Sequence, residues 1–352
     1  MKTIRVQASR EYDVMIGSGL INLAGQYVRM IEGAKKAALI SDDIVYGLYG
    51  HTCQEALKEA GLEVFAYVFP HGEQSKNLST YGQILEFMNE KKLTRSDLVV
   101  ALGGGVTGDM AGFAAATYQR GIRFVQIPTT LLAAVDSSVG GKTAVDLKNS
   151  KNQVGCFWQP SLVLCDTDTL ATLSEEQYRC GCAEVIKYGV IGSEEFFQSL
   201  LKTPVKEQAE QVIAACVEMK RDIVQEDEYD TGKRMLLNFG HTFGHAAEAC
   251  SDFSLLHGQA VAMGMAVMAR AACREGKCEE AVVTAIETIE KKYGLPDRIP
   301  YTKEELLKEI AADKKMAGSS MRIVVPKRIG ACVIETIPAE QIEQILTDGG
   351  VA

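Results

Sequence analysis

The sequence predicts an α/β domain followed by a mainly helical domain. The chain has 352 residues, enough for two domains of ~150 residues each. Its first half alternates short β-branched runs with amphipathic helical patterns, whereas its second half is helical in period almost throughout. The pattern changes near Asp168, so we expect domains at residues 1–168 and 169–352.

The first half contains short apolar segments that predict strands. They lie at residues 3–6, 37–40, 64–68, 98–102 and 124–127. Apolar residues at three-to-four spacing predict helices between them, at 20–30, 45–60 and 80–91. This alternation indicates a mostly parallel sheet with helices on both faces.

The second half contains helical patterns at 174–189, 205–225, 243–250, 259–275, 279–292 and 303–312. Ser174, followed by Glu175, Glu176 and Gln177, is typical of a capped helix start. Only residues 321–325 and 332–337 resemble strands in this half. We therefore expect a largely helical second domain.

Composition excludes several classes of protein. Apolar residues make up 47% of the chain and charged residues 24%, which is the profile of a globular protein. The net charge of 37 − 46 = −9 argues against a general nucleic-acid or acidic-membrane surface. An anionic ligand therefore has to meet a local basic pocket.

The ten cysteines form no C-x-x-C pair, and we interpret them as reduced, mostly buried thiols of a cytoplasmic protein. Residues 1–13 lack the apolar segment of a signal peptide. The most apolar helical stretch, 261–269, is far shorter than the ~20 residues that a membrane span needs. We expect no membrane association.

A glycine-rich loop follows the strand expected at 98–102. Gly103, Gly105 and Gly108 satisfy G-x-G-x-x-G, a pattern that brings a pyrophosphate close to backbone N–H groups at a helix start. The motif follows the fourth strand instead of the first, and Gln126 stands where an acidic residue is usual. The alternative is a tight strand-to-helix turn, but Asp109 at the helix start favours a ligand site.

Two further polar loops are ambiguous. Residues 140–143 resemble a Walker motif, but its first glycine would fall on Asp136, so a P-loop is excluded. What remains is a turn that carries Asp136 and Lys142. The loop 71–76 is either a surface turn or part of a site at the carboxyl ends of the strands.

Three of the five histidines, His241, His245 and His257, lie close together in the sequence. His241 and His245 are spaced i, i+4 on one helix face, which makes them the first-choice metal pair from spacing alone. A catalytic zinc site also needs a third ligand. Glu184, in an apolar helix, is the candidate carboxylate, unless it only pairs with Lys187.

Two other basic residues leave alternatives open. Lys220 and Arg234 are either solvated helix charges or inward-facing ligands for an anion. Single histidines are more often core or surface residues, but three together favour a metal or acid–base site.

Ordered motifs along nearly the whole chain resemble the 3-dehydroquinate synthase family. They are Gly72-Glu73-Gln74 with Lys76, residues 103–109, Arg120 with Pro128-Thr129-Thr130-Leu131-Leu132, residues 136–143, Lys151-Asn152, residues 184–189, residues 238–245 and Asp313-Lys314-Lys315. The resemblance implies an N-terminal Rossmann-like NAD-binding domain and a C-terminal helical metal domain. This is also the architecture of the iron-type alcohol dehydrogenases.

The resemblance also implies roles for individual residues. It makes Glu184, His241 and His257 the ligands of Zn²⁺, or of Co²⁺, and makes His245 a substrate-side residue. It implies NAD contacts at Asp42, Glu73, Lys76, Gly105, Val106, Thr107, Gly108, Asp109, Thr129, Thr130, Lys142, Lys151, Thr169, Leu170, Ala171 and Thr172. It implies a substrate and phosphate shell of Arg120, Asp136, Lys142, Lys151, Asn152, Lys187, Lys220, Arg234, Asn238, His245 and Lys314.

The implied reaction belongs to the shikimate pathway, which leads to chorismate and the aromatic amino acids. A small sugar phosphate, 3-deoxy-D-arabino-heptulosonate 7-phosphate, is converted to 3-dehydroquinate and phosphate. The steps are transient oxidation by NAD, phosphate β-elimination, reduction, ring opening and intramolecular aldol closure. Arg120 is expected to reach the neighbouring subunit's site, which implies a homodimer.

The sequence departs from the family pattern in two segments near the phosphate region. Ala144-Val145-Asp146 stands where Gly-Val-Asn is common, and Ser150 stands where glycine often precedes the Lys-Asn pair. Sister sugar-phosphate cyclases, 2-deoxy-scyllo-inosose synthase and the epi-valiolone synthases, share the implied fold and metal set. Lys220 and His245 fit the dehydroquinate branch better than the valiolone branch but leave the inosose and aminodehydroquinate branches open.

Two readings outside the cyclases remain. A polyol dehydrogenase would consume NAD⁺ stoichiometrically and would not need basic residues for two anions. A non-enzymatic sensor of the dinucleotide would hold structural zinc in a closed four-ligand site.

Overall fold

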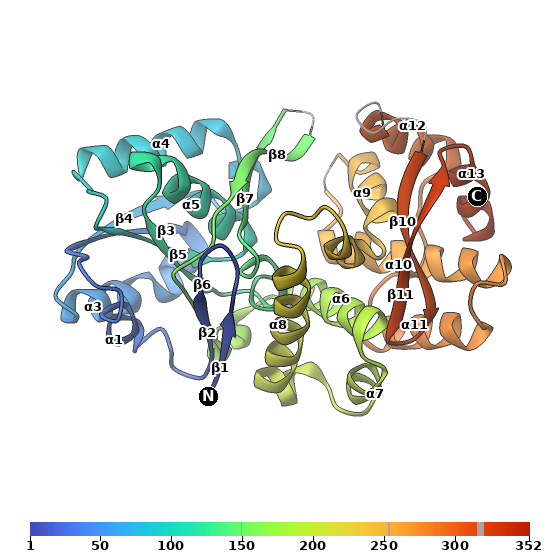
Figure 1. Cartoon of the computed structure of the whole chain (residues 1–352), viewed down its shortest axis with the longest axis horizontal. Coiled ribbons are helices and arrows are strands. Elements are labelled where there is room, and N and C mark those ends of the chain that lie inside the picture. Colours follow the sequence, from blue (N-terminus) through green and yellow to red (C-terminus); the bar gives the residue numbers. More distant parts are fainter. Residues whose placement is uncertain (149, 253, 315–319) are drawn as a thin grey trace. The chain divides into compact units, whose positions relative to one another are not determined.

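The computed structural model describes residues 1–148, 150–252, 254–314 and 320–352 (Figure 1). The chain divides into two compact units. Unit 1 comprises Met1–Leu173 and Ala209–Tyr229, and unit 2 comprises Ser174–Gln208 and Asp230–Ala352. We expected the division after residue 168, but unit 1 continues to Leu173 and also includes helix α8 (Ala209–Glu226). Helix α8 belongs to unit 1 because it contacts strands β1 and β2.

Unit 1 is built on a seven-stranded sheet in the order β1-β2-β9-β6-β5-β3-β4. Its strands are β1 (Lys2–Val6), β2 (Tyr12–Gly17), β3 (Lys36–Asp42), β4 (Glu63–Phe69), β5 (Leu98–Gly103), β6 (Arg123–Pro128) and β9 (Leu162–Asp166). Only β1 pairs antiparallel, with β2, and every other pairing is parallel. The mostly parallel sheet is thus confirmed, and so are the five strands expected in this half.

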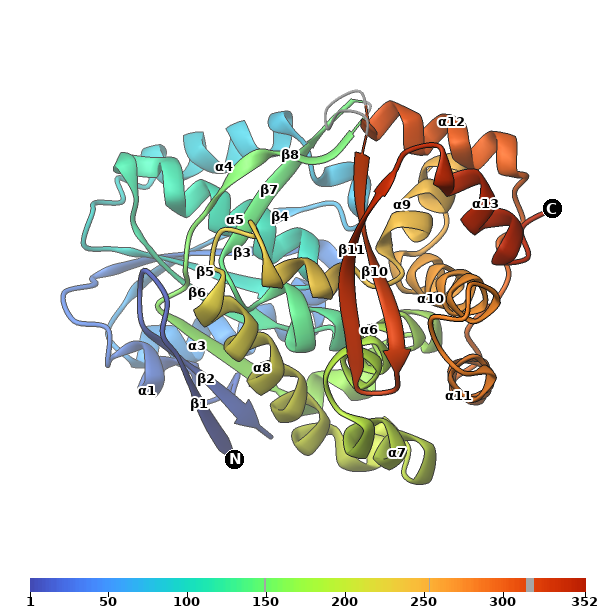
Figure 2. The ribbon, with the colours of Figure 1, turned by 45° about the vertical axis from the view of Figure 1, so that its right-hand side comes forward.

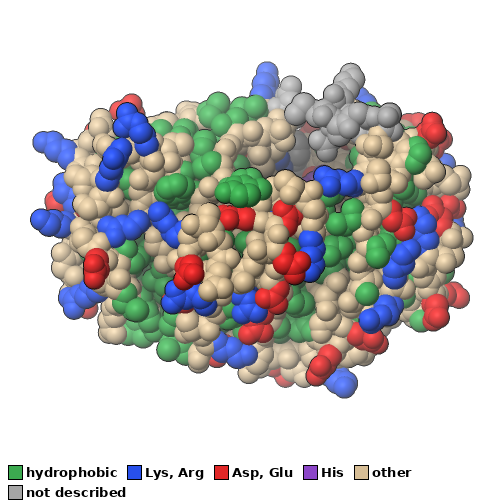
Figure 3. Space-filling view, in the orientation of Figure 1, with side chains coloured by type: hydrophobic (Ala, Val, Ile, Leu, Met, Phe, Trp, Pro, Cys, Tyr) green, Lys and Arg blue, Asp and Glu red, His purple; other side chains and the backbone are tan. Residues whose placement is uncertain are grey.

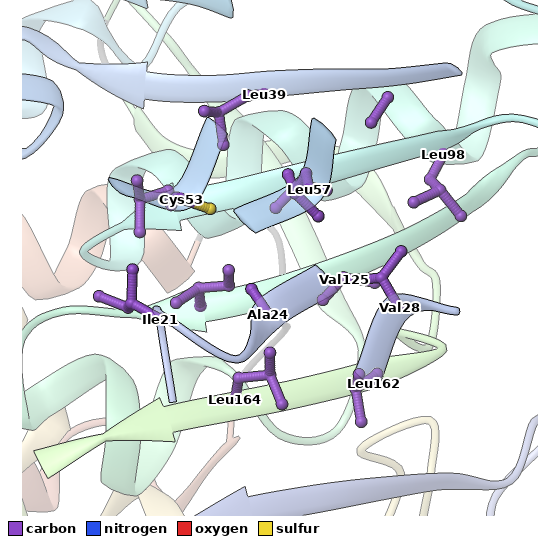
Figure 4. Close-up of a cluster of buried hydrophobic side chains, with 14 of the residues drawn as sticks. Ile21, Ala24, Val28, Leu39, Cys53, Leu57, Leu98, Val125, Leu162 and Leu164 are labelled. Atoms are coloured by element: carbon purple, nitrogen blue, oxygen red, sulfur yellow. The ribbon is translucent and has the colours of Figure 1, made fainter. Parts of the chain in front are cut away.

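Neighbouring side chains of one strand pack in two different hydrophobic clusters, one on each face of the sheet. Leu39 of β3 packs in a cluster with Ala24, Cys53 and Leu57 (Figure 4). Its neighbour Ile40 packs in the other cluster, with residues of α4 and α5. Because both faces of the sheet are covered, the sequences of its central strands are almost continuously apolar.

The helices of unit 1 are α1 (Ala24–Val28), α2 (Asp43–Val45), α3 (His51–Glu59), α4 (Leu78–Glu90), α5 (Gly105–Thr117) and α8. Short helical turns η1 (Tyr46–Gly50), η2 (Glu73–Ser75), η3 (Tyr118–Arg120), η4 (Ala133–Ser137) and η5 (Thr167–Thr172) complete it. A separate antiparallel hairpin joins β7 (Lys142–Leu147) to β8 (Ser150–Phe157). The sequence did not predict this hairpin.

Unit 2 is mainly helical, as expected. Its elements are α6 (Glu175–Gly192), α7 (Glu194–Lys202), η6 (Val205–Gln208), η7 (Lys233–Asn238), α9 (His241–Cys250), α10 (His257–Arg274), α11 (Glu280–Lys292), α12 (Lys303–Lys314), β10 (Ser320–Arg328), β11 (Ala331–Pro338) and α13 (Gln341–Asp348). Helix α10 is central and contacts α6, α9, α11 and α13 (Figure 2). Ser174 caps α6 as predicted, accepting from the Gln177 N–H at 3.2 Å.

Acidic and basic side chains are interspersed on the face shown in Figure 3. Among the described helices, none combines the length and the apolar character that a membrane span requires. All ten cysteines are free, and Cys53, Cys165, Cys180, Cys182 and Cys216 are buried.

Candidate active site

Most of the residues expected to contact NAD lie in unit 1, where parallel strands end at one edge of the sheet. Asp42 ends β3, Lys76 follows β4, the glycine loop follows β5, Thr129 follows β6, and η5 follows β9. Ligand sites of open α/β sheets form at the carboxyl ends of the strands. The fold therefore brings these separate sequence segments to one edge.

The glycine loop joins β5 directly to α5. Gly104 is the N-cap of α5, and no side chain caps the first turn, so its amide groups are open to a phosphate. A Cβ at Gly108 would lie 2.6 Å from the Gln126 Oε1 atom, so a side chain there would collide with β6. The helix start that the glycine spacing predicted is present, and the close approach of a pyrophosphate to it stays a prediction.

Lys76 forms a buried polar contact between two of the expected NAD-contacting loops. Its side chain is 5% exposed, and its Nζ donates to Asp109 Oδ2 at 2.6 Å and to Asn152 Oδ1 at 2.5 Å. Burial raises the pKa of Asp109 even though Lys76 opposes that effect. The loop 71–76 is therefore more than a surface turn, and the sequence did not predict this pairing.

The β7–β8 hairpin is attached to the same network through Asp146. Asn152 has a left-handed φ of 57°, and its N–H donates to Asp146 Oδ1 at 2.7 Å. The Asp146 N–H in turn donates to the Lys76 carbonyl at 2.8 Å. Lys151 Nζ lies 3.7 Å from Glu73 Oε1. Asp146, one of the residues that depart from the family pattern, thus fixes the backbone of Asn152.

One buried hydroxyl in this region has no internal partner. Thr129 is 3% exposed, and among the described residues its Oγ1 atom makes no hydrogen bond. Its backbone N–H donates to the Gly103 carbonyl at 3.0 Å, which holds it beside the glycine loop. An orphaned buried hydroxyl at this position fits a polar ligand such as a dinucleotide.

Lys220 of α8 faces inward. It is 5% exposed, and its Nζ donates to the Asp136 carbonyl at 2.6 Å and also pairs with the Asp136 carboxylate. Of the two readings of Lys220, the solvated helix charge is therefore excluded. Arg234 of η7, in unit 2, is also buried, at 2% exposure.

Three other expected substrate residues of unit 1 are exposed, namely Arg120, Lys142 and Asn152. Lys142 begins β7, directly after Gly140 and Gly141, so this loop enters a strand and not the helix of a P-loop. Arg120 is exposed at a strained turn, with a φ of 65°.

In unit 2, three side chains from different helices converge. Glu184 lies in α6, His241 begins α9 and His257 begins α10. Glu184 Oε1 lies 3.3 Å from His257 Nε2 and 3.7 Å from His241 Nε2. One ligand atom from each of the three lies within 4.8 Å of the others. One carboxylate and two imidazoles form the ligand set of an open zinc site.

Both imidazoles have their other nitrogen occupied. His241 Nδ1 lies 3.1 Å from the Phe239 carbonyl, and His257 Nδ1 lies 3.3 Å from Glu248 Oε2. In the neutral form of each ring, the acceptor at Nδ1 places the proton there and leaves the Nε2 lone pair to a metal. The donor set therefore fits Zn²⁺ or Co²⁺. Sequence reasoning missed Glu248, although it lies one helical turn after His245.

Glu184 also pairs with Lys187, one helical turn further along α6, and both side chains are completely buried. The two readings of Glu184, metal ligand or ion-pair partner, are thus compatible. In this structure burial, with Lys187 next, lowers the pKa of His241 to about 3. Burial also acts to lower the pKa of His257, but hydrogen bonds to Glu184 and Glu248 raise it to about 10.

The remaining expected residues are distributed as follows. His245 is exposed, and its ring lies 5.2 Å from the His241 ring, but Glu184 is not in the ligand group that contains His245. The spacing alone favoured His241 and His245 as the metal pair. In the structure, His241 and His257 are the two histidines grouped with Glu184. Asn238 ends η7, Lys314 is the last residue of α12 and its side chain lies outside the described residues, as does Lys315.

The family models that match this chain describe one family. The model of the 3-dehydroquinate synthase N-terminal region matches residues 66–180, and that of the C-terminal region matches residues 181–316. A 3-dehydroquinate synthase of Streptococcus suis is 43% identical over 342 residues, 95% of this chain and 96% of the relative. One from Enterococcus faecalis is 41% identical over all of both chains.

Solved structures share the fold. A 2-deoxy-scyllo-inosose synthase complexed with carbaglucose-6-phosphate, NAD⁺ and Co²⁺ has a TM-score of 0.89 at 26% identity, covering 98% of this chain and 99% of that one. A 2-epi-5-epi-valiolone synthase from Streptomyces hygroscopicus, with NAD⁺ and Zn²⁺, has a TM-score of 0.86 at 28% identity, with 99% of each chain covered. An iron-containing alcohol dehydrogenase, 18% identical with 99% of each chain covered and a TM-score of 0.71, shows the same architecture.

The two family models adjoin at residues 180 and 181 and together span most of the chain, and the curated relatives match it along its length. The chain belongs to the 3-dehydroquinate synthase family, whose members are carbocycle-forming, phosphate-eliminating enzymes.

Proposed function

We propose that this enzyme converts 3-deoxy-D-arabino-heptulosonate 7-phosphate to 3-dehydroquinate and phosphate in the shikimate pathway. The observation that carries the proposal is the burial of a cation beside a carboxylate–histidine cluster, Lys187 next to Glu184. Arg234 is a second buried cation of the same unit. This substrate carries a carboxylate and a phosphate, and in a chain with a net charge of −9 these anionic groups need a local cluster of cations.

The cofactors follow from the two site regions. Unit 1 would hold NAD through the loops after β3, β4, β5, β6 and β9, and unit 2 would hold Zn²⁺ or Co²⁺ through Glu184, His241 and His257. The related structures with NAD⁺ and Co²⁺ or Zn²⁺ support both assignments. When bound, NAD⁺ supplies a hydride acceptor, and the metal supplies a Lewis acid that lowers the pKa of a substrate hydroxyl.

The chain's own residues mainly bind and orient the substrate. In unit 1, Lys142 and Lys220 would supply positive charge for the anionic groups of the substrate, and Asp136 holds the Lys220 ammonium group in place. In unit 2, Arg234 would supply positive charge. The departing phosphate takes the C6 proton itself, so the protein needs few bases. Catalysis by the polypeptide is then chiefly positioning and charge stabilisation.

A product assay tests the reaction. Purified protein is mixed with NAD⁺, Zn²⁺ and the heptulosonate phosphate, and phosphate release and the carbocyclic product are followed by NMR. Stoichiometric phosphate and dehydroquinate with no standing NADH support the proposal. Turnover of glucose 6-phosphate alone, in a parallel sample, assigns the enzyme to the inosose branch.

Lys142→Ala and His245→Ala separate catalysis from folding. Both side chains are exposed, so their loss is expected to change the free energy of unfolding by no more than about 0.5 kcal/mol. Each is expected to lower kcat/KM by about 100-fold, because it removes a charge-stabilising group from the site. Equal losses of turnover and stability in these variants would contradict the assignment.

The other two readings predict different results. A polyol dehydrogenase would accumulate NADH steadily with glycerol. A zinc sensor would use a fourth protein ligand, whereas the group around Glu184 among the described residues has three members. The three-membered group supports an open metal site.

We also propose a cytoplasmic homodimer that acts on a small molecule. The exposed Arg120 supports the dimer, and ten free cysteines support a reducing compartment. If Arg120 acts in the neighbouring subunit's site, mixing inactive Arg120→Ala and Lys142→Ala proteins restores activity, because each mixed dimer regains one intact site. Sedimentation of the wild type as a monomer would exclude the dimer.

A further inference from the structure

A buried carboxylate lies behind one of the two histidines of the metal cluster. Glu248 of α9 is 1% exposed, and its Oε2 atom lies 3.3 Å from His257 Nδ1. The Nε2 atom of the same ring lies 3.3 Å from Glu184 Oε1. His257 therefore has a carboxylate at each of its two ring nitrogens.

The two histidines differ in what holds them. His241 Nδ1 faces a neutral backbone carbonyl, that of Phe239, at 3.1 Å. His257 Nδ1 faces the carboxylate of Glu248. A carboxylate accepts the Nδ1 proton more strongly than a carbonyl does and makes the opposite nitrogen a better electron donor. The two candidate ligands therefore differ in the charge of the group that faces Nδ1.

The position of Glu248 follows from helix geometry. His241, His245 and Glu248 are spaced i, i+4 and i+7 along α9, so they share one face. Helices α9 and α10 pack against each other, and His257 is the first residue of α10. Burying an acidic side chain is costly unless it is paired, so its burial beside His257 indicates a contact of consequence.

We propose that Glu248 is a positioning residue for the metal site. By accepting the Nδ1 proton of His257, it holds the ring with Nε2 toward Glu184 and increases the affinity for Zn²⁺. The proposal rests on the metal site given under the proposed function. The competing arrangement is a second metal ion bound by His245, Glu248 and His257, whose ligand atoms also lie within 4.8 Å of one another.

Zinc affinity of the metal-free full chain tests the proposal. The dissociation constant is measured by competition with a chromophoric chelator. In Glu248→Gln the amide oxygen still accepts from Nδ1 but carries no charge, so we expect a dissociation constant about 10-fold higher than that of the wild type. In Glu248→Leu no acceptor remains, and we expect it about 100-fold higher. Glu290→Gln is the control, because it changes another fully buried glutamate of unit 2 and should leave zinc affinity unchanged.

The Co²⁺ absorption spectrum provides a second readout. A changed His257 orientation alters the ligand field, so the Co²⁺-loaded Glu248 variants are expected to show shifted d–d bands, whereas Glu290→Gln is not. Unfolding of the metal-free proteins shows whether each variant folds. If Glu248→Leu does not fold, the test rests on Glu248→Gln, which has nearly the same shape as the wild type. Wild-type zinc affinity and an unchanged spectrum in Glu248→Gln would overturn the proposal.

Other outcomes separate this proposal from the metal site on which it rests. The metal site predicts that the wild type binds one equivalent of Zn²⁺ and that Glu184→Ala does not bind it. If this difference is not found, the metal site itself is wrong, and so is the role of Glu248. If that equivalent binds but the Glu248 variants behave as wild type, only the role of Glu248 is wrong. Two tight equivalents in the wild type, one of them lost in Glu248→Gln, would favour the second metal ion instead.

Discussion

Glu290 is a buried acid whose carboxylate lacks a hydrogen bond. It lies in α11 at 0% exposure, and neither of its carboxylate oxygens has a hydrogen-bond partner among the described residues. The nearby Arg270 instead pairs with Glu287 at 2.7 Å and with Asp297 at 3.0 Å. Burial, together with Asp297, raises the pKa of Glu290 well above its usual 4.5. The folded protein therefore keeps this group protonated where the unfolded chain loses the proton.

This raised pKa predicts a pH-dependent loss of stability. As the pH rises above about 4.5, only the unfolded chain ionises at this position, so the free energy of unfolding falls until the pH reaches the raised pKa. Glu290→Gln removes the titration and is expected to be more stable than the wild type at pH 8 by about 1–3 kcal/mol. Urea unfolding at pH 5 and pH 8 measures the difference. The same difference at both pH values would contradict the prediction.

Asp146 makes a second prediction about a single residue. It holds the left-handed Asn152 backbone, and Asn152 in turn accepts from Lys76. Asp146→Ala removes one hydrogen bond of about 1 kcal/mol and is expected to raise the KM for substrate about 5-fold. Asp146→Asn keeps an oxygen acceptor and should retain the wild-type KM in steady-state assays. Equal effects of the two substitutions would show that the negative charge matters and not the hydrogen bond.

At the scale of elements, a missing side chain lets α9 and α10 approach. A Cβ at Gly264 of α10 would lie 1.9 Å from the Gly240 carbonyl oxygen, and Gly240 is the N-cap of α9. His241 follows Gly240 directly. The contact that packs the two helices therefore also sets the position of a proposed metal ligand.

Gly264→Ala is expected to push these helices apart. It should lower the free energy of unfolding by about 1–3 kcal/mol through overpacking and weaken zinc binding at the same time. Gly82→Ala is the matched control, because Gly82 is inside α4 and nothing lies within 4 Å of an added Cβ. It should stabilise the protein by about 0.5–1 kcal/mol. Thermal unfolding of both variants measures these changes in stability. An unchanged free energy of unfolding in Gly264→Ala would show that the two helices adjust to the added methyl group.

Elements with a strong local pattern could be predicted from the sequence, whereas those that depend on pairing could not. The buried parallel strands such as β5 are continuous apolar runs, and α6 has its own N-cap. The hairpin strands β7 and β8 are partly exposed and are defined by each other, so their sequences carry little signal. The short strand β9 was missed because a brief apolar run is ambiguous by itself.

The site shows the same limit. The histidine spacing in α9 is local and could be read directly, but the choice of His257 over His245 needed the family resemblance. Glu248 gave no signal because its partner lies on another helix. The contact between Lys76 and Asp109 joins residues that are 33 positions apart, which no periodicity reveals.

For the whole molecule, the two units are expected to respond to different ligands. Hydrogen exchange should show that Zn²⁺ protects the starts of α9 and α10, whereas NAD⁺ protects the loop between β5 and α5. At a free Zn²⁺ concentration 1,000 times the dissociation constant, removing the metal costs about 4 kcal/mol. Zinc protection at β5–α5 with none at α9 and α10 would contradict the assignment of the metal to unit 2.

The course of the chain also bears on how the protein is made. Unit 1 is interrupted, because α6 and α7 are synthesised before α8 returns to contact β1 and β2. During translation the sheet therefore leaves the ribosome without one of its helices, and the surface that α8 covers stays open while the first part of unit 2 emerges. A shortened gene that ends after Leu173 would yield a sheet with this surface permanently exposed, a species that needs a chaperone or aggregates.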